Sequence, residues 1–142
     1  MSERYYPPSP ELTRCDEIIQ DYFLTGDYST CFKEHMKLAL KGYPLAECQI
    51  GYFYMQGLGV ARNASKALYW NRRAARHGDR DAQCNLAEQY EKGLGTQPDR
   101  AFAESWYRTS ARNGCREAIE KCRALGIAWE MADAEGGVDG KS

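Results

Sequence analysis

The chain has 142 residues, of which 43% are hydrophobic and 27% charged, and its formal net charge is −1. These values are typical of one folded domain and exclude wholesale disorder. They also argue against the broad basic field that non-specific nucleic-acid binding requires, and no apolar run approaches the roughly 20 residues that span a bilayer. Because β-branched residues are scarce, we expect an all-α fold.

The N-terminal residues 1–10 predict an extended segment that precedes the folded domain. They contain neither the apolar core of a secretory signal nor an Arg-rich amphipathic helix. We therefore expect a cytoplasmic protein with no membrane segment. In that compartment the six cysteines are expected to be reduced thiols.

Residues 11–42 predict the first pair of helices, in a degenerate form. Cys15, Ile19 and Phe23 are four residues apart, so they predict one apolar helical face. Asp27 is expected to cap a second helix, because its carboxylate can accept hydrogen bonds from free backbone N–H groups.

Residues 43–78 predict a complete pair. The first helix has an apolar face of Ala46, Ile50 and Tyr54, and it is expected to end at the sequence Gly57-Leu58-Gly59. The second helix is expected to begin after a capping Asn63 and to carry Ala67, Trp70, Ala74 and Ala75 on its buried face.

Residues 79–114 repeat this pattern at an offset of 36 residues. The offset relates Gly-Leu-Gly at 57–59 to Gly-Leu-Gly at 93–95, Trp70 to Trp106, and Gly78 to Gly114. Asp79 and Asp99 stand at the corresponding cap positions. Repetition at a fixed period is typical of helical solenoids.

Residues 115–135 predict helices that close the solenoid with a charged outer face. Ile127, Trp129 and Met131 are expected to form a last short helix that folds back. Residues 136–142 are Gly-rich and polar, which predicts a disordered tail.

The repeated residues resemble the Sel-one-like repeat, a relative of the tetratricopeptide repeat. The matching positions are Ala46, Ile50, Gly51, Tyr54, Gly57, Gly59, Val60, Asn63, Lys66, Ala67, Trp70, Ala74, Ala75 and Gly78. The resemblance implies a right-handed α-α superhelix of about three and a half helix-turn-helix repeats over 11–135. It also implies a non-enzymatic protein-interaction scaffold, and it identifies no particular partner.

The phase of the family places one stripe of each first helix on the inner surface of the solenoid. The predicted groove residues are Arg14, Glu17, Asp21, Leu45, Cys48, Tyr52, Asp81, Cys84 and Glu88. The first helices carry net negative charge and the second helices net positive charge. We therefore expect a peptide or helix of a partner protein, with an apolar anchor and basic residues, to bind in an adaptor, assembly or immunity-type role.

Three aromatic or long apolar residues surround Tyr54 and cannot all face the core with it. They are Tyr52, Phe53 and Met55. Some of them are expected to be exposed or covered by a partner, and Tyr52 is the preferred candidate.

No arrangement of residues typical of catalysis, of a cofactor or of a zinc site is visible in the sequence. The isolated His77 is expected only to complement a helix dipole. Six cysteines keep open an alternative function, a cysteine-based metal-binding or redox-responsive protein. A homodimer through the solenoid end near Trp129 is a further alternative.

Overall fold

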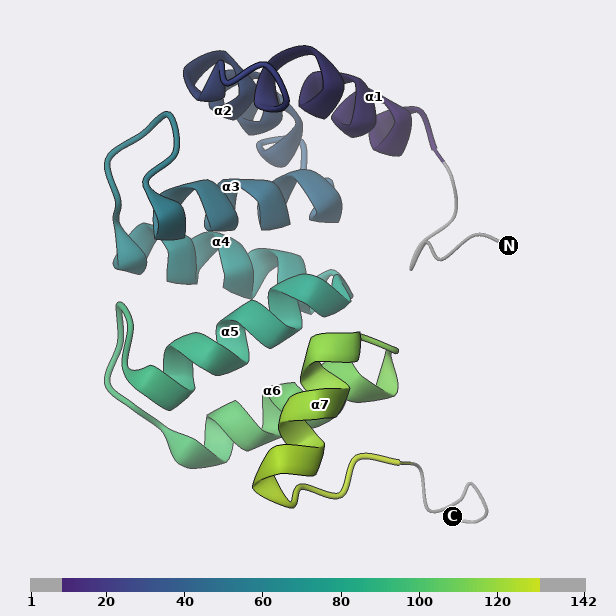
Figure 1. Cartoon of the computed structure of the whole chain (residues 1–142), viewed down its shortest axis with the longest axis vertical. Coiled ribbons are helices and arrows are strands. Elements are labelled where there is room, and N and C mark those ends of the chain that lie inside the picture. The colour runs from purple at the N-terminus through teal and green to yellow at the C-terminus, as the bar shows by residue number, and fades with distance from the viewer. Residues whose placement is uncertain (1–8, 131–142) are drawn as a thin grey trace.

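The computed structural model describes residues 9–130, which form seven α-helices and one π-helical turn, with no strand (Figure 1). The helices are α1 (Pro10–Ile18), α2 (Tyr28–Ala39), α3 (Pro44–Gln56), α4 (Ala64–Arg76), α5 (Arg80–Lys92), α6 (Arg100–Arg112) and α7 (Arg116–Leu125), and the π-helical turn η1 (Ile19–Phe23) follows α1. The predicted all-α fold is confirmed.

The helices form antiparallel pairs that stack along the long axis of the molecule (Figure 1). Each helix from α2 to α7 packs mainly against the helix before it and the helix after it in the chain. The succession from α1 to α7 is therefore a solenoid of helix pairs, as the 36-residue repeat predicts.

The predicted helix ends are present. Asp27, Asn63, Asp79 and Asp99 each accept a hydrogen bond from the backbone N–H three residues further on, at 2.8–3.2 Å. Gly57 ends α3 in the left-handed conformation, with φ of 70°. These caps satisfy backbone groups that the helix itself leaves without partners.

The residues that recur with the repeat form the core. Ala46, Ile50, Tyr54 and Trp70 belong to one buried cluster, and Tyr90 belongs to the next. Trp106 is half-buried and packs against the second of these clusters. The prediction of inward-facing aromatic side chains is confirmed.

The first unit departs from the predicted helical phase. Ile18 is fully buried beside Cys15, whereas Ile19 and Phe23 are half-buried. Ile18 lies at the end of α1, three residues after Cys15, and the π-helical turn follows it, with the N–H of Leu24 donating to the carbonyl of Ile19 five residues earlier. A π turn holds an extra residue, so the residues after it shift around the helix axis.

Successive units meet through a close backbone approach at a glycine. A Cβ on Gly59 would lie 2.3 Å from the carbonyl oxygen of Tyr28, the first residue of α2. A Cβ on Gly95 would lie 2.4 Å from the carbonyl oxygen of Ala64, the first residue of α4. The same contact therefore recurs one repeat later, and no other residue fits there.

A buried carboxylate joins the two helices of the second unit. Glu47 is fully buried, and it accepts hydrogen bonds from His77 Nδ1 at 2.7 Å and from Arg73 Nε at 3.1 Å. In the next unit Gln83 and Asn113 stand at the same repeat positions, and the Asn113 amide donates to Gln83 Oε1 at 2.9 Å. The expectation that His77 only complements the helix dipole is wrong, because His77 donates to the buried Glu47. The sequence did not indicate that Glu47 is buried opposite it.

The residues after α7 fold back without forming the expected short helix over 127–130. Ile127 is buried and Trp129 is half-buried against the core. Arg108 and Arg112 of α6 donate to the carbonyl oxygens of Ala128 and Trp129, at 2.8 and 2.9 Å. These contacts hold the segment in extended form. Met131, the rest of the predicted capping region, the predicted tail at 136–142 and residues 1–8 lie outside the described residues.

The glycine contact between units predicts a position-specific loss of stability. Gly95→Ala is expected to lower the free energy of unfolding by more than about 2 kcal/mol, because the new Cβ meets the α4 backbone and the residue has positive φ. Gly126→Ala is the matched control, since it has positive φ but no atom within 4 Å of the new Cβ. Urea denaturation of both variants measures the difference in their free energies of unfolding. Equal losses of stability in the two variants would contradict the role of the contact.

The Glu47 site predicts that one pair of residues can replace the other. Glu47→Ala alone is expected to lower the free energy of unfolding by about 2 kcal/mol, because Arg73 and His77 lose their acceptor. The double variant Glu47→Gln, His77→Asn carries the residues of the next unit and is expected to stay within about 1 kcal/mol of the parent. Denaturation midpoints measure both effects, and a double variant as unstable as Glu47→Ala would contradict the prediction.

Candidate functional site

A hollow of about 420 Å³ lies on the face formed by the first helices of the units. Its lining residues are Ile19, Phe23, Cys48, Gln49, Tyr52, Asp81, Asn85 and Glu117. They come from η1, α3, α5 and α7, and none comes from a second helix of a pair. The hollow therefore lies among the first helices, the surface on which the groove is expected.

The hollow has an apolar side and an acidic side. Ile19, Phe23 and Tyr52 supply the apolar side, and Asp81 and Glu117 stand opposite at equivalent positions of consecutive units. Neither carboxylate forms an ion pair with a basic side chain within residues 9–130, although Asp81 Oδ1 accepts a hydrogen bond from the Cys115 thiol at 3.7 Å. A ligand there meets apolar surface and two unpaired negative charges.

The π-helical turn explains why Ile19 and Phe23 belong to the hollow, which the sequence analysis did not predict. Ile18 takes the core position at the end of α1, and in the π turn that follows Ile19 and Phe23 stay half-buried at the hollow. Such turns are frequent at functional sites. The sequence contains a signal for this arrangement, because the adjacent Ile18 and Ile19 allow either residue to take the core position of the helix.

The aromatic cluster of α3 divides between core and groove. Phe53 is 0% exposed and packs near the rings of Phe23 and Phe32, with ring centroids 6.0 and 6.2 Å away. Tyr52 is 42% exposed and lines the hollow, and Met55 is half-buried. The expectation that these three residues cannot all face the core is confirmed.

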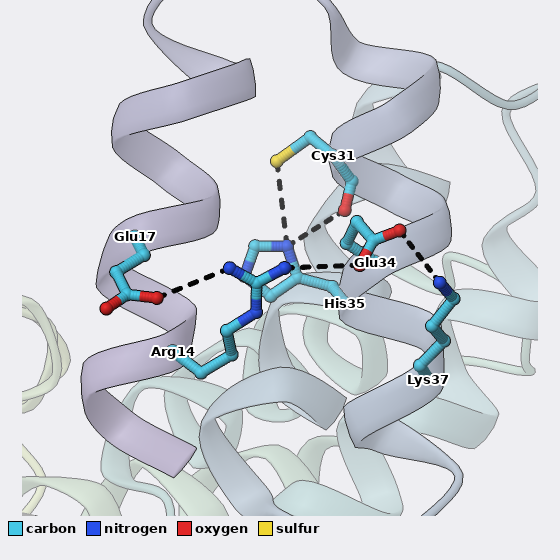
Figure 2. Close-up of polar contacts among 6 residues, drawn as sticks. All are labelled: Arg14, Glu17, Cys31, Glu34, His35 and Lys37. Atoms are coloured by element: carbon cyan, nitrogen blue, oxygen red, sulfur yellow. Dashed lines mark hydrogen bonds and ion pairs between the residues drawn. The ribbon is translucent and has the colours of Figure 1, made fainter. Parts of the chain in front are cut away.

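Two of the predicted groove residues take part in a polar network of the first unit (Figure 2). Arg14 of α1 forms ion pairs with Glu17 at 3.3 Å and with Glu34 of α2 at 3.4 Å. Lys37 pairs with the other carboxylate oxygen of Glu34 at 2.9 Å. Arg14 and Glu17 do not line the hollow, and the Arg14–Glu34 pair joins α1 to α2.

The remaining predicted groove residues are dispersed around the hollow. Asp21 is exposed on η1, and Leu45 is half-buried against the core. Glu88 pairs with Lys92 at 2.7 Å, and Cys84 is buried beneath the surface. The structure therefore brings together Cys48, Tyr52 and Asp81 of the predicted set. The role of the whole set in binding stays a prediction.

Two cysteines that are distant in sequence meet below the hollow. The sulfur atoms of Cys84 and Cys115 and a carboxylate oxygen of Glu117 all lie within 4.8 Å of one another. A structural zinc site takes four Cys or His ligands, and this group offers two thiols and one carboxylate. It does not match that pattern, and we assign no metal to it.

The buried histidine of the first unit is held by its own helix. His35 Nδ1 lies 3.0 Å from the carbonyl oxygen of Cys31, which can only accept, so Nδ1 carries the proton. His35 Nε2 is buried and has no hydrogen-bond partner among the described residues. Burial lowers the pKa of this imidazole, so the folded protein holds it neutral. The buried Cys31 thiol lies 3.6 Å from the same Nδ1 (Figure 2), but Nδ1 already carries a proton and burial raises the pKa of this thiol to about 11, so the imidazole does not act there as a base toward the sulfur.

Comparison with known proteins finds similarity to repeat proteins. A family model described as Sel1 repeat matches residues 44–79 and 80–115. A Sel1 repeat protein from Oxalobacter formigenes is 30% identical, with a TM-score of 0.73, over 89% of this chain and 51% of that chain.

A second crystal structure is also similar to this chain. It is c5321, a protective antigen present in uropathogenic Escherichia coli strains that displays an SLR fold. It is 27% identical, with a TM-score of 0.71, over 87% of this chain and 27% of that chain. The chain thus spans about half the length of the first relative and about a quarter of the second. No curated protein matches the chain.

The helices were also compared with the requirements of a membrane span. Within residues 9–130, none is both long and apolar enough to cross a bilayer.

The neutral His35 predicts that stability falls in mild acid. Its folded pKa is lowered, so the unfolded chain binds more protons once the pH drops below the ordinary value of about 6.5. The free energy of unfolding is therefore expected to decrease between about pH 7 and pH 5. Urea denaturation at these pH values should show a smaller decrease for His35→Leu. An identical decrease in both proteins would contradict the assignment.

Proposed function

Because the chain belongs to the Sel1 repeat family, whose repeats generally mediate protein–protein interactions, we propose that it is a non-enzymatic module that binds a peptide segment of a partner protein in its inner hollow. The segment carries one apolar anchor side chain next to a lysine or arginine. The observation that carries this proposal is the joint lining of one hollow by Tyr52, Phe23 and the unpaired carboxylates Asp81 and Glu117.

The apolar side of the hollow suits an anchor side chain. Tyr52 is exposed, although it lies on a helix whose other aromatic residues are buried. A partly exposed aromatic ring in a concave site buries a large area at small cost in conformational entropy. Ile19 and Phe23 extend this apolar surface from the adjacent unit.

The acidic side supports a basic residue next to the anchor. Asp81 and Glu117 project from α5 and α7 at positions 36 residues apart, so consecutive units present them side by side. A lysine or arginine there would gain attraction from two charges that have no basic partner within the described residues. The side-chain amides of Gln49 and Asn85, also 36 residues apart, line the same hollow and can bond to the backbone of an extended peptide.

A peptide-display selection on the full chain tests this proposal. We expect enrichment of peptides with an aromatic or aliphatic residue within two positions of lysine or arginine. Tyr52→Ala and Glu117→Lys are each expected to weaken the binding of the selected peptides about tenfold, as measured by fluorescence anisotropy.

Two control variants separate the hollow from the rest of the surface. Tyr69→Ala removes a tyrosine of α4 that is 53% exposed, and Glu120→Lys reverses an exposed charge on α7 outside the hollow. Both should bind as the parent does. Selection of no peptide above background, or equal weakening by the control variants, would overturn the proposal.

A further inference from the structure

Cys115 occupies the position at which the preceding repeat has a capping aspartate. Asp79 caps α5 with φ of −72° and ψ of 114°, and Cys115, 36 residues later, precedes α7 with φ of −71° and ψ of 118°. The two backbones therefore have the same conformation. A thiolate at this position would lie, like the carboxylate of Asp79, at the positive end of a helix dipole.

A second thiol lies beside Cys115. Cys84 projects from α5, and its sulfur is within 4.8 Å of the Cys115 sulfur. The Cys115 thiol also donates a hydrogen bond to Asp81 Oδ1 at 3.7 Å. The two cysteines are 3% and 8% exposed, so they meet between two neighbouring units of the solenoid.

The two thiols differ in acidity. The pKa of Cys115 is lowered to about 6, chiefly by its interaction with the Cys84 side chain, and the backbone N–H of Ala118 acts in the same direction, against the effects of burial and of Asp81. The same interaction, together with burial, raises the pKa of Cys84. The opposite directions favour Cys115 as the more acidic thiol of the pair.

Cys115 is almost entirely buried, but it borders an open hollow at the surface. It lines a second, open hollow of about 640 Å³ together with Arg80, Asp81, Arg116 and Glu117. Cys15, Cys31 and Cys122 are fully buried, and burial raises their pKa values, so those thiols are expected to be unreactive.

We propose that Cys84 and Cys115 form a reversible oxidation site, in which Cys115 is the nucleophile toward a hydroperoxide and Cys84 the resolving thiol. The site is defined by the contact of the two sulfurs, the helix-end position of Cys115 and the open hollow. It does not depend on peptide binding, so its test is separate from that of the proposed function.

The reaction balances with a hydroperoxide as the oxidant. The Cys115 thiolate attacks the terminal oxygen, an S–O bond forms, the O–O bond breaks, and the departing hydroxide or alkoxide takes up a proton. Cys84 is then no longer held protonated by a neighbouring thiolate. Its sulfur attacks the sulfenic acid, an S–S bond forms, the S–O bond breaks, and water leaves with the proton of Cys84. Two sulfurs are oxidised and one peroxide is reduced. A small thiol reverses the step by exchange.

Peptide mapping of the peroxide-treated chain tests the proposal. Trypsin places Cys84 in residues 81–92 and Cys115 in residues 113–116. Hydrogen peroxide is expected to join these two peptides with loss of two hydrogen atoms, and dithiothreitol should separate them. In Cys84→Ala the reaction should stop at a Cys115 sulfenic acid, which dimedone traps.

Alkylation with iodoacetamide measures the nucleophile directly. At pH 7 Cys115 is expected to react first among the six cysteines, and Cys84→Ala should slow it about tenfold by raising its pKa toward the ordinary value. Cys48→Ala is the matched control, since Cys48 stands one repeat before Cys84 and its thiol bonds to Asp79. It should change neither result.

Three outcomes would overturn the proposal. The first is oxidation that joins other cysteines or leaves both peptides unchanged. The second is a Cys115 alkylation rate that Cys84→Ala does not alter. The third is a stoichiometric zinc ion that protects both thiols in the purified chain, which would make this group a metal site instead.

Discussion

The close approach of backbone to backbone between consecutive units is the constraint on which the rest of the structure depends. Gly59 lies against the start of α2, and Gly95 lies against the start of α4, with no room for a Cβ at either position. Because the loop of one unit touches the first turn of the preceding second helix, each unit is placed on its neighbour in the same way. The 36-residue period of the sequence thus becomes a regular stacking in space.

This regular stacking also builds the hollow. Residues at one position of successive first helices come to lie side by side, as Asp81 and Glu117 do, and as Gln49 and Asn85 do. The stacking also brings Cys115, the residue before α7, close to Cys84 of α5, although the two cysteines do not stand at equivalent positions of the repeat. Functional groups that are more than 30 residues apart therefore become neighbours without any local motif in the sequence.

The first unit shows how a departure from the repeat can serve the site. Its π-helical turn shifts Ile19 and Phe23 out of the core phase, and the resulting half-buried side chains form the apolar wall of the hollow. The ion pair of Arg14 with Glu34 joins α1 to α2 (Figure 2). The most irregular part of the chain is thus part of the candidate site.

The sequence by itself determined the helix pairs, their caps and their core. The signals for these features act over a few residues, so they can be recognised in the local sequence. They are glycines with positive φ, capping Asp and Asn residues, and aromatic residues at helical spacing. It also placed Cys48, Tyr52 and Asp81 on the inner surface. Only the tertiary structure decided that Glu47 is buried opposite His77, that a π turn moves Phe23 to the hollow, and that Cys115 lies against Cys84. These features depend on the distance between atoms of different helices, and that distance is set by packing between units and not by spacing along the chain.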